Sequence, residues 1–207
     1  VSALVYKTGA WDLRVCEDIK AFVHSESMDR TVSGDGLYSA LLLGADVRDN
    51  YYMIKRKLKL SSWSARDVSD VWIEENDIDF PLERLPAIKA ERDSMLSVGA
   101  HDAATIPYTV EMDSYTVTVC GYPSISDVRV VGLGVGNAGD KPIDVRVWFN
   151  ELRVGTSTAR RGYALAIDGA FNLSSVLSMG AAFKYVSAGI NAGLYSMQDW
   201  KVDARLE

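Results

Sequence analysis

The chain has 207 residues, about half of them hydrophobic and about a quarter charged. This composition suffices for one or two domains with a sizeable core, and it excludes an intrinsically disordered chain. The formal net charge of −6 provides no basic surface of the kind that holds a phosphate backbone, so no nucleic-acid partner is expected.

No run of apolar residues reaches the length of a transmembrane helix. The chain opens at Val1 in a strand-like run, without an initiator methionine or a signal peptide. It stops inside an alternating run formed by Trp200, Val202, Ala204 and Leu206. We therefore expect this chain to be a segment of a larger protein.

The N-terminal part is rich in predicted strands. Short strands are expected at residues 4–16, 18–25, 37–47 and 51–60, with a glycine turn at residues 34–36 before the third. Along the fourth strand, apolar residues alternate with lysines, which is typical of a half-exposed strand with a cationic outer face. Lysines at such positions also block the edge of a sheet.

One helix is predicted over residues 81–95. Asp79 is the expected N-cap, two residues ahead of Pro81, and Pro86 falls within the first turns, where it makes the start irregular. We expect the helix to lie on a sheet. Its apolar stripe comprises Leu82, Leu85, Ile88, Ala90 and Met95.

Four further strands are predicted at residues 108–111, 115–120, 128–135 and 145–154. Many short strands with a single helix are typical of a β-sandwich of the jelly-roll type. The sandwich is expected to end near Val154. Residues 155–162, which contain two glycines and two arginines, are the best candidate for a linker.

Residues 163–185 form two runs in which apolar residues alternate with small or polar ones, separated by Ser174 and Ser175. Successive residues of a strand lie on opposite faces of its sheet, and each run has the ~10 residues that a tilted strand needs to cross a bilayer. Tyr163 and Tyr185 would meet at one end of this hairpin, where aromatic girdles occur. The residues predicted to face lipid are Leu165, Ile167, Phe171, Leu173, Leu177, Met179 and Phe183.

The same alternation also fits an amphipathic hairpin that covers a soluble core, so the pattern alone leaves both readings open. On the membrane reading, residues 1–154 are a sandwich domain, 155–162 a linker and 163–207 antiparallel strands of an outer-membrane β-barrel. The predicted fold class is then mainly β: a jelly-roll-like sandwich with one helix, followed by transmembrane β-barrel strands.

Residues 134–139 match the G-x-G-x-x-G fingerprint of dinucleotide sites. Such a site needs a helix that opens directly after the loop, so that its N-terminal amides meet the pyrophosphate. Here Asp140, Lys141 and Pro142 lead into a β-branched run at residues 143–147. We therefore interpret the motif as a glycine-rich hairpin turn and expect no bound cofactor.

The remaining candidates for chemistry are sparse, and we predict neither a catalytic residue nor a metal ligand. The two cysteines, Cys16 and Cys120, are either a disulfide or, as we favour, two free thiols. Of the two histidines, His24 and His101, the first is expected to be a partly buried or surface residue of a strand. An acidic cluster at residues 74–79 could hold calcium but lacks the EF-hand spacing, so a solvated loop is favoured.

Several blocks, in order and with their spacing, resemble the SprA family, also called Sov. These are residues 11–14 (WDLR), 22–26 (FVHSE), 49–52 (DNYY), 71–76 (VWIEEN) running to 80–82 (FPL), 88–92 (IKAER) and 147–153 (VWFNELR). The resemblance spans residues 11–170. The family is the outer-membrane translocon of the type IX secretion system of Bacteroidetes, which also serves gliding motility.

The resemblance implies a conduit and not an enzyme: a very large outer-membrane barrel through which folded cargo proteins leave the periplasm. Implied partners are a PorV-type barrel protein, a periplasmic plug protein, cargo with C-terminal sorting domains and outer-membrane lipid. A wide lumen needs a polar inner wall, and the residues expected to face it are Asp168, Asn172, Ser178 and Lys184. The sandwich would sit beside the pore, where it shapes the opening or docks a partner.

Two other functions are kept as alternatives. A soluble jelly-roll module for carbohydrate binding or adhesion would use Tyr51, Tyr52 and Trp63 as a sugar platform. A glycoside hydrolase would need two carboxylates, for which Glu74 and Glu151 can be nominated although their spacing gives no support. On any of these readings we expect four large apolar residues to be core anchors: Trp72, Phe80, Trp148 and Leu152.

Overall fold

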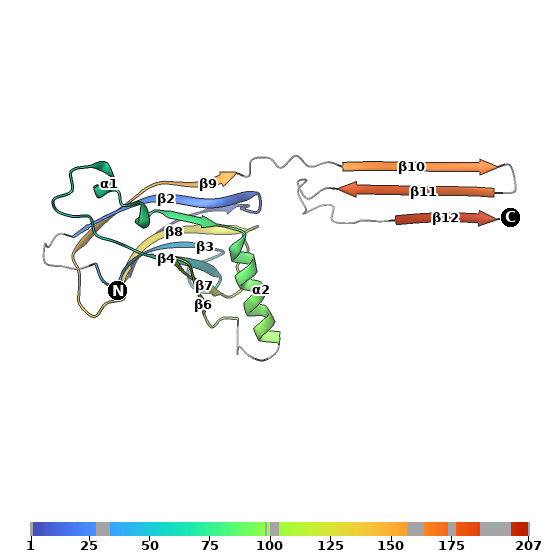
Figure 1. Ribbon diagram of the computed structural model, residues 1–207. Helices are drawn as coiled ribbons and strands as arrows, with labels where there is room; N and C mark the ends of the chain where they lie inside the picture. Colours follow the sequence, from blue (N-terminus) through green and yellow to red (C-terminus); the bar gives the residue numbers. More distant parts are fainter. Residues whose placement is uncertain are drawn as a thin grey trace. The chain divides into compact units, whose positions relative to one another are not determined.

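The computed structural model describes residues 2–27, 34–97, 99, 104–156, 164–173, 177–186 and 200–206, with side chains described from residue 3 to residue 155. The chain divides into two compact units, Val1–Thr156 (unit 1) and Ser157–Glu207 (unit 2) (Figure 1).

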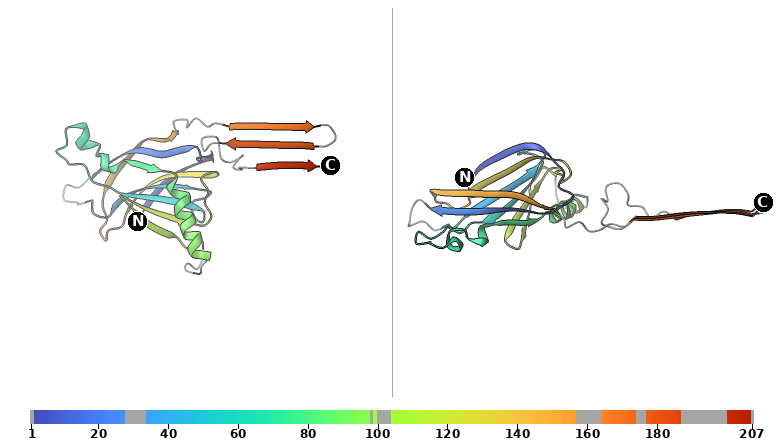
Figure 2. Two further views of the ribbon diagram at one scale, coloured as in Figure 1. Left: turned by 45° about the vertical axis from the view of Figure 1, so that its right-hand side comes forward. Right: turned by 90° about the horizontal axis from the view of Figure 1, so that it is seen from above.

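Unit 1 contains two antiparallel sheets (Figures 1 and 2). Sheet A has the strand order β1-β8-β3-β4-β7-β6, and sheet B has the order β5-β2-β9. The strands of sheet A are β1 (Ser2–Trp11), β8 (Val128–Asn137), β3 (Leu37–Gly44), β4 (Tyr51–Lys57), β7 (Tyr115–Cys120) and β6 (Tyr108–Met112). Those of sheet B are β5 (Ile78–Pro81), β2 (Cys16–Ser27) and β9 (Val145–Thr156). The predicted mainly β class is thus confirmed, while the jelly-roll connectivity stays a prediction.

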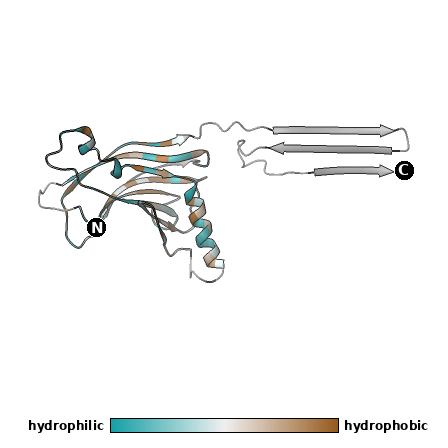
Figure 3. Cartoon of the chain, viewed as in Figure 1, coloured by the Kyte–Doolittle hydropathy of each residue, from teal (hydrophilic) through white to brown (hydrophobic). Residues whose placement is uncertain are grey.

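The core of unit 1 lies between the two sheets. Alternate residues of β2, such as Ile19 and Val23, pack in one cluster with Leu41 and Leu43 of β3 and with Phe80 of β5. All five are nearly inaccessible to solvent. Figure 3 shows hydrophobic and hydrophilic stretches along β2. The buried positions Ile19, Ala21 and Val23 alternate because successive residues of a strand point to opposite faces. In β4 the binary pattern likewise matches burial, since Tyr52 and Ile54 are buried between half-exposed neighbours, whereas β3 is buried on both faces.

Helices are few in the described part of unit 1: α1 (Val68–Val71), a 3-10 turn η1 (Glu74–Asn76) and α2 (Arg84–Ser97). The helix predicted at residues 81–95 is α2, but it begins at Arg84. Asp79 is not its N-cap, because Asp79 lies in β5, where its backbone N–H and carbonyl oxygen both bond the Tyr115 hydroxyl at 2.9 Å. Pro86 is tolerated because the first four N–H groups of a helix have no intrahelical partner.

The buried face of α2 differs from the predicted stripe. It contains Leu85, Ile88 and Arg92, whereas Ala90 is exposed. The guanidinium of Arg92 is fully buried, donates to Asp93 at 2.7 Å and 3.0 Å, and donates to the Ala104 carbonyl at 3.3 Å. These hydrogen bonds replace the hydrogen bonds to water that the guanidinium loses when it is buried.

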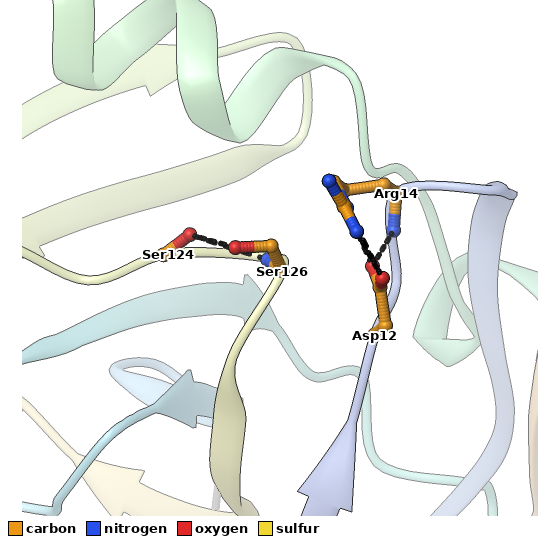
Figure 4. Close-up of polar contacts among 4 residues, drawn as sticks. All are labelled: Asp12, Arg14, Ser124 and Ser126. Atoms are coloured by element: carbon orange, nitrogen blue, oxygen red, sulfur yellow. Dashed lines mark hydrogen bonds and ion pairs between the residues drawn. The ribbon is translucent and has the colours of Figure 1, made fainter. Parts of the chain in front are cut away.

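Short polar loops fix the turn between β1 and β2 (Figure 4). The Asp12 carboxylate accepts the backbone N–H of Arg14 at 3.1 Å and two guanidinium N–H groups at 2.6 Å and 2.9 Å. These bonds lower the pKa of Asp12 to about 2. Leu13, between them, donates its N–H to the Ile125 carbonyl at 2.8 Å, which joins this turn to the loop where the Ser124 and Ser126 hydroxyls lie 2.8 Å apart.

The G-x-G-x-x-G motif lies at the end of β8 and in the connection that follows it, and no helix opens there. The predicted hairpin is wrong, however, because β8 belongs to sheet A and β9 to sheet B. The chain therefore crosses from one layer to the other. Gly136 is needed on the outer face of β8, since a Cβ there would overlap the ring of Tyr38, its neighbour on β3.

Unit 2 contains one antiparallel sheet of three strands in sequence order. These are β10 (Ala164–Leu173), β11 (Leu177–Val186) and β12 (Trp200–Leu206).

Candidate functional site

The first candidate is the sheet of unit 2, whose backbone register places apolar residues opposite apolar residues on neighbouring strands. In β10 and β11, Ile167 is opposite Phe183 and Phe171 is opposite Met179. The next pair of strands continues this row, with Phe183 opposite Trp200 and Ala181 opposite Val202. Directly paired positions belong to the same face of a sheet. One face of the sheet therefore carries an apolar row across all three strands.

The other face contains the remaining alternate positions. Asn172 is opposite Ser178, Asp168 is opposite Ala182, and Lys184 is opposite Ala166. The positions expected to face lipid and those expected to face a lumen thus fall on opposite faces of the paired strands. Their side chains, together with Tyr163, Ser174 and Ser175, lie outside the described part of the structure, so the two environments stay predictions. Among the described residues, no helix is long and apolar enough to span a membrane.

The second candidate is an apolar groove on unit 1, between the inner face of β1 and β8 and the neighbouring strand β9. Its cavity volume is about 780 Å³. On sheet A, Val5 is opposite Leu133, which is in turn opposite Leu41 of β3. Leu41 is completely buried, whereas Val5 on the same face is 80% exposed. The difference arises because, in the part of the chain that the structure describes, sheet B ends at β9 and contributes no strand over β1.

Strand β9 contributes the opposite wall of the groove through a β-bulge. Between the pairs Phe22–Asn150 and Lys20–Arg153, one residue of β2 faces two residues of β9. Glu151, in this bulge, has a φ of 52°, which is the left-handed region. The extra residue reverses the alternation of β9. Leu152 therefore lies on the same face as Phe149, and it lines the groove.

The groove is mostly apolar, and the charged residues that border it are Lys7 and Arg153, here called its rim. Arg153 donates to the Glu151 carboxylate at 2.9 Å and lies over the Phe22 ring. Lys7 is exposed and has no ion pair or hydrogen bond with any other residue whose side chain is described. Lys7 therefore carries the unpaired positive charge among the described lining residues.

An aromatic cluster on the outer face of sheet B contains His24, which is buried and not a surface residue. Its ring stacks on Trp148 at 4.9 Å between ring centroids and tilts against Trp72 at 5.4 Å. Its Nδ1 lies 2.5 Å from the Val71 carbonyl oxygen. These contacts give His24 a packing role.

Of the four expected core anchors, Phe80 is confirmed and two are wrong. Trp148 is 43% and Leu152 is 40% exposed, while Trp72 is half-buried. Both exposed residues lie on β9. Trp148 is on the outer face of the sheet, where His24 stacks on it, and Leu152 lies at the open edge, because β9 is the last strand of its sheet among the described residues.

The acidic cluster at residues 74–79 is divided among separate partners. Glu75 pairs with Lys59 at 2.9 Å, Asp79 with Lys20 at 3.0 Å, and Asp77 accepts the N–H of Val23 at 3.0 Å. Burial raises the pKa of Asp77. Across the described residues, no group of three or more His, Cys, Asp or Glu side chains could hold a metal ion.

Both cysteines are free thiols. Cys16 lies in β2 of sheet B, and Cys120 lies in β7 of sheet A. Burial raises the pKa of both thiols, which keeps them protonated and unreactive. His101 lies outside the described residues.

The sugar platform of the alternative function does not form as expected. Tyr52 is 1% exposed, and its hydroxyl donates to the Pro123 carbonyl at 3.2 Å. Tyr51 precedes it in the same strand and so points to the opposite face. Only Trp63 of the three is well exposed. For the hydrolase alternative, Glu151 is engaged by Arg153.

A comparison with protein-family models matches residues 2–207 to the SprA_N model, which is described as a motility related/secretion protein. The match covers nearly the whole chain and confirms the resemblance seen in the sequence blocks. A search of curated proteins found no match.

Proposed function

Because this chain belongs to the SprA_N family of motility related/secretion proteins, we propose that it is a segment of a very large outer-membrane β-barrel that conducts folded cargo proteins out of the cell. In this proposal unit 2 contributes strands to the barrel wall, and unit 1 is a β-sandwich of jelly-roll type beside the pore. The proposed partners are a PorV-type barrel, a periplasmic plug protein, cargo with C-terminal sorting domains and outer-membrane lipid.

The observation that carries the proposal is the register of unit 2. Strands β10 and β11 each have ten residues, which matches the ~10 residues that cross a bilayer at the tilt of a barrel strand. The apolar row through Ile167 and Phe183 continues onto β12 at Trp200. A sheet with one apolar face and one face of small and polar residues suits a wall between lipid and a water-filled lumen.

The proposal is tested by cysteine accessibility in the whole protein in outer-membrane vesicles. The free thiols are first removed by Cys16→Ser and Cys120→Ser. Single cysteines are then introduced at neighbouring positions of opposite faces, as Ile167→Cys against Asp168→Cys, and labelled with a membrane-impermeant maleimide. We expect Asp168→Cys to react and Ile167→Cys to be protected.

The second neighbouring pair, Phe183→Cys against Lys184→Cys, repeats the test on β11. Val68→Cys is a positive control, because Val68 is highly exposed on unit 1. Equal labelling of both members of each pair would contradict the proposal. Recovery of the whole protein in the soluble fraction, without detergent, would equally contradict it.

A further inference from the structure

The apolar groove of unit 1 has the features of an incomplete sandwich. Among the described residues, sheet A has six strands and sheet B has three, so the inner face of β1 is left open and that of β8 is half-buried. That face continues the core, since Leu133 lies between the buried Leu41 and the exposed Val5. An apolar face that is fully buried on one strand and open two strands away lacks a covering layer.

The open edge of β9 offers a place for this layer. No strand pairs with that edge in the described part of unit 1, so alternate backbone N–H and C=O groups of β9 are available. A strand added there would become the fourth strand of sheet B, about 4.8 Å from β9. Its inward side chains would lie over Val5 and Leu133, and next to Leu152.

The charge at the rim limits what the added strand can be. Arg153 is already paired with Glu151 at 2.9 Å, whereas Lys7 has no partner among the described side chains. A second copy that paired through its own β9 would offer Lys7 no free carboxylate, because Glu151 is the one acidic residue of β9 and it is engaged by Arg153. A carboxylate on the added strand would instead pair with Lys7.

We propose that the groove binds an extended segment of a different polypeptide, which adds a fourth strand to sheet B. The segment has apolar side chains at alternate positions and an Asp or Glu that reaches Lys7. Strand addition of this kind takes its affinity from main-chain hydrogen bonds and its specificity from the side chains that enter the groove. The proposal depends on unit 1 alone and is independent of the membrane assignment of unit 2.

The test uses the full chain and fluorescein-labelled peptides of the same length as β9. The parent peptide alternates Val with Thr and has one central Glu, and matched peptides replace the Glu by Gln or Lys. A fourth peptide is N-methylated on the edge that would face β9. Fluorescence anisotropy gives the Kd of each.

We expect the Glu peptide to bind about fivefold more tightly than the Lys peptide, as an exposed charge pair allows. The variant Lys7→Glu should reverse this preference. The N-methylated peptide should lose binding, because it cannot donate to the β9 edge. Val5→Lys should weaken binding of the Glu peptide by about tenfold or more, since an apolar contact is lost from the groove.

Val68→Lys is the matched control, because Val68 is 77% exposed and lies on α1, away from the groove. It should leave the affinity unchanged. Three results would overturn the proposal: no saturable binding of any peptide, an unchanged preference in Lys7→Glu, or equal weakening by Val5→Lys and Val68→Lys. Dimerisation of the chain that Val5→Lys abolishes would assign the groove to a second copy and would also overturn it.

Discussion

Replacing Phe80 by alanine tests whether the short strand β5 anchors the core of unit 1. The ring is 1% exposed and lies edge-on to Tyr115, with 5.3 Å between ring centroids. Truncating a buried phenylalanine removes its transfer free energy and leaves a cavity, which together cost about 3–5 kcal/mol. Loss of an edge-on aromatic pair places the change toward the middle or upper part of this range, so we expect about 4 kcal/mol.

The measurement is the free energy of unfolding from a urea titration of the purified chain, followed by tryptophan fluorescence. Leu152→Ala is the matched control, because this side chain is half-exposed on β9 and should lose only about 1 kcal/mol. A loss below about 2 kcal/mol for Phe80→Ala would refute the reasoning, since it would mean that the ring leaves no cavity behind. An equal loss in the two variants would refute it as well.

Three further predictions concern single residues. Asn76 is fully buried and bonds both the N–H (2.7 Å) and the carbonyl (2.8 Å) of Lys59. Asn76→Ala should therefore lower the free energy of unfolding in urea by about 2–4 kcal/mol, and a loss under about 1 kcal/mol would contradict this. The Asp46 carboxylate accepts three backbone N–H groups, which lower its pKa from 3.8 to about 2. The stabilisation of the fold by this carboxylate is therefore complete above pH 3.8 and is lost as the pH falls through 2. The melting temperature of Asp46→Asn should therefore lie below that of the wild type near neutral pH and converge with it at low pH, whereas a constant gap would argue against the bonds. Glu151 and Asp113 both have a φ of 52°, which glycine adopts without strain. Glu151→Gly and Asp113→Gly should therefore each raise the free energy of unfolding by up to about 1 kcal/mol. A melting temperature that falls in both variants would exclude strain at these positions.

The alternation of residues predicted strand positions and buried faces well. The expected strand at residues 115–120 coincides with β7, and the face of β4 that contains Tyr52 and Ile54 is buried as the pattern requires. These features depend on neighbouring residues along one strand, so a single sequence contains the information.

Features that depend on distant partners were not predictable. Asp79 looks like an N-cap, yet its backbone groups bond Tyr115, which lies 36 residues away. Trp148 and Leu152 look like core residues because they are large and apolar. They are exposed because β9 is at the edge of sheet B, and a strand's place in the order is fixed by pairings across the whole unit.

The candidate sites divide in the same way. The two faces of the unit 2 hairpin were deduced from alternation, and the backbone register aligns them as expected. The apolar groove was not foreseen. It needs both the unequal size of the two sheets and the bulge at Glu151, and a bulge is visible in sequence only as a break in alternation between Phe149 and Leu152.

The pairing of the first strands of unit 1 with its last strands has a consequence for how the chain folds. Strand β1 pairs with β8, and β2 pairs with β9, so each sheet closes a loop that spans most of the unit. The entropy of closing such loops must be overcome before the contacts form, which makes folding slow. A chain that emerges from its N-terminus, whether from a ribosome or through a membrane, therefore keeps β1 unpaired until β8 has emerged. The edge of β2 that pairs with β9 stays open until residue 156 has emerged. The described sandwich of unit 1 is therefore complete only when its last strand, β9, has emerged and paired with β2.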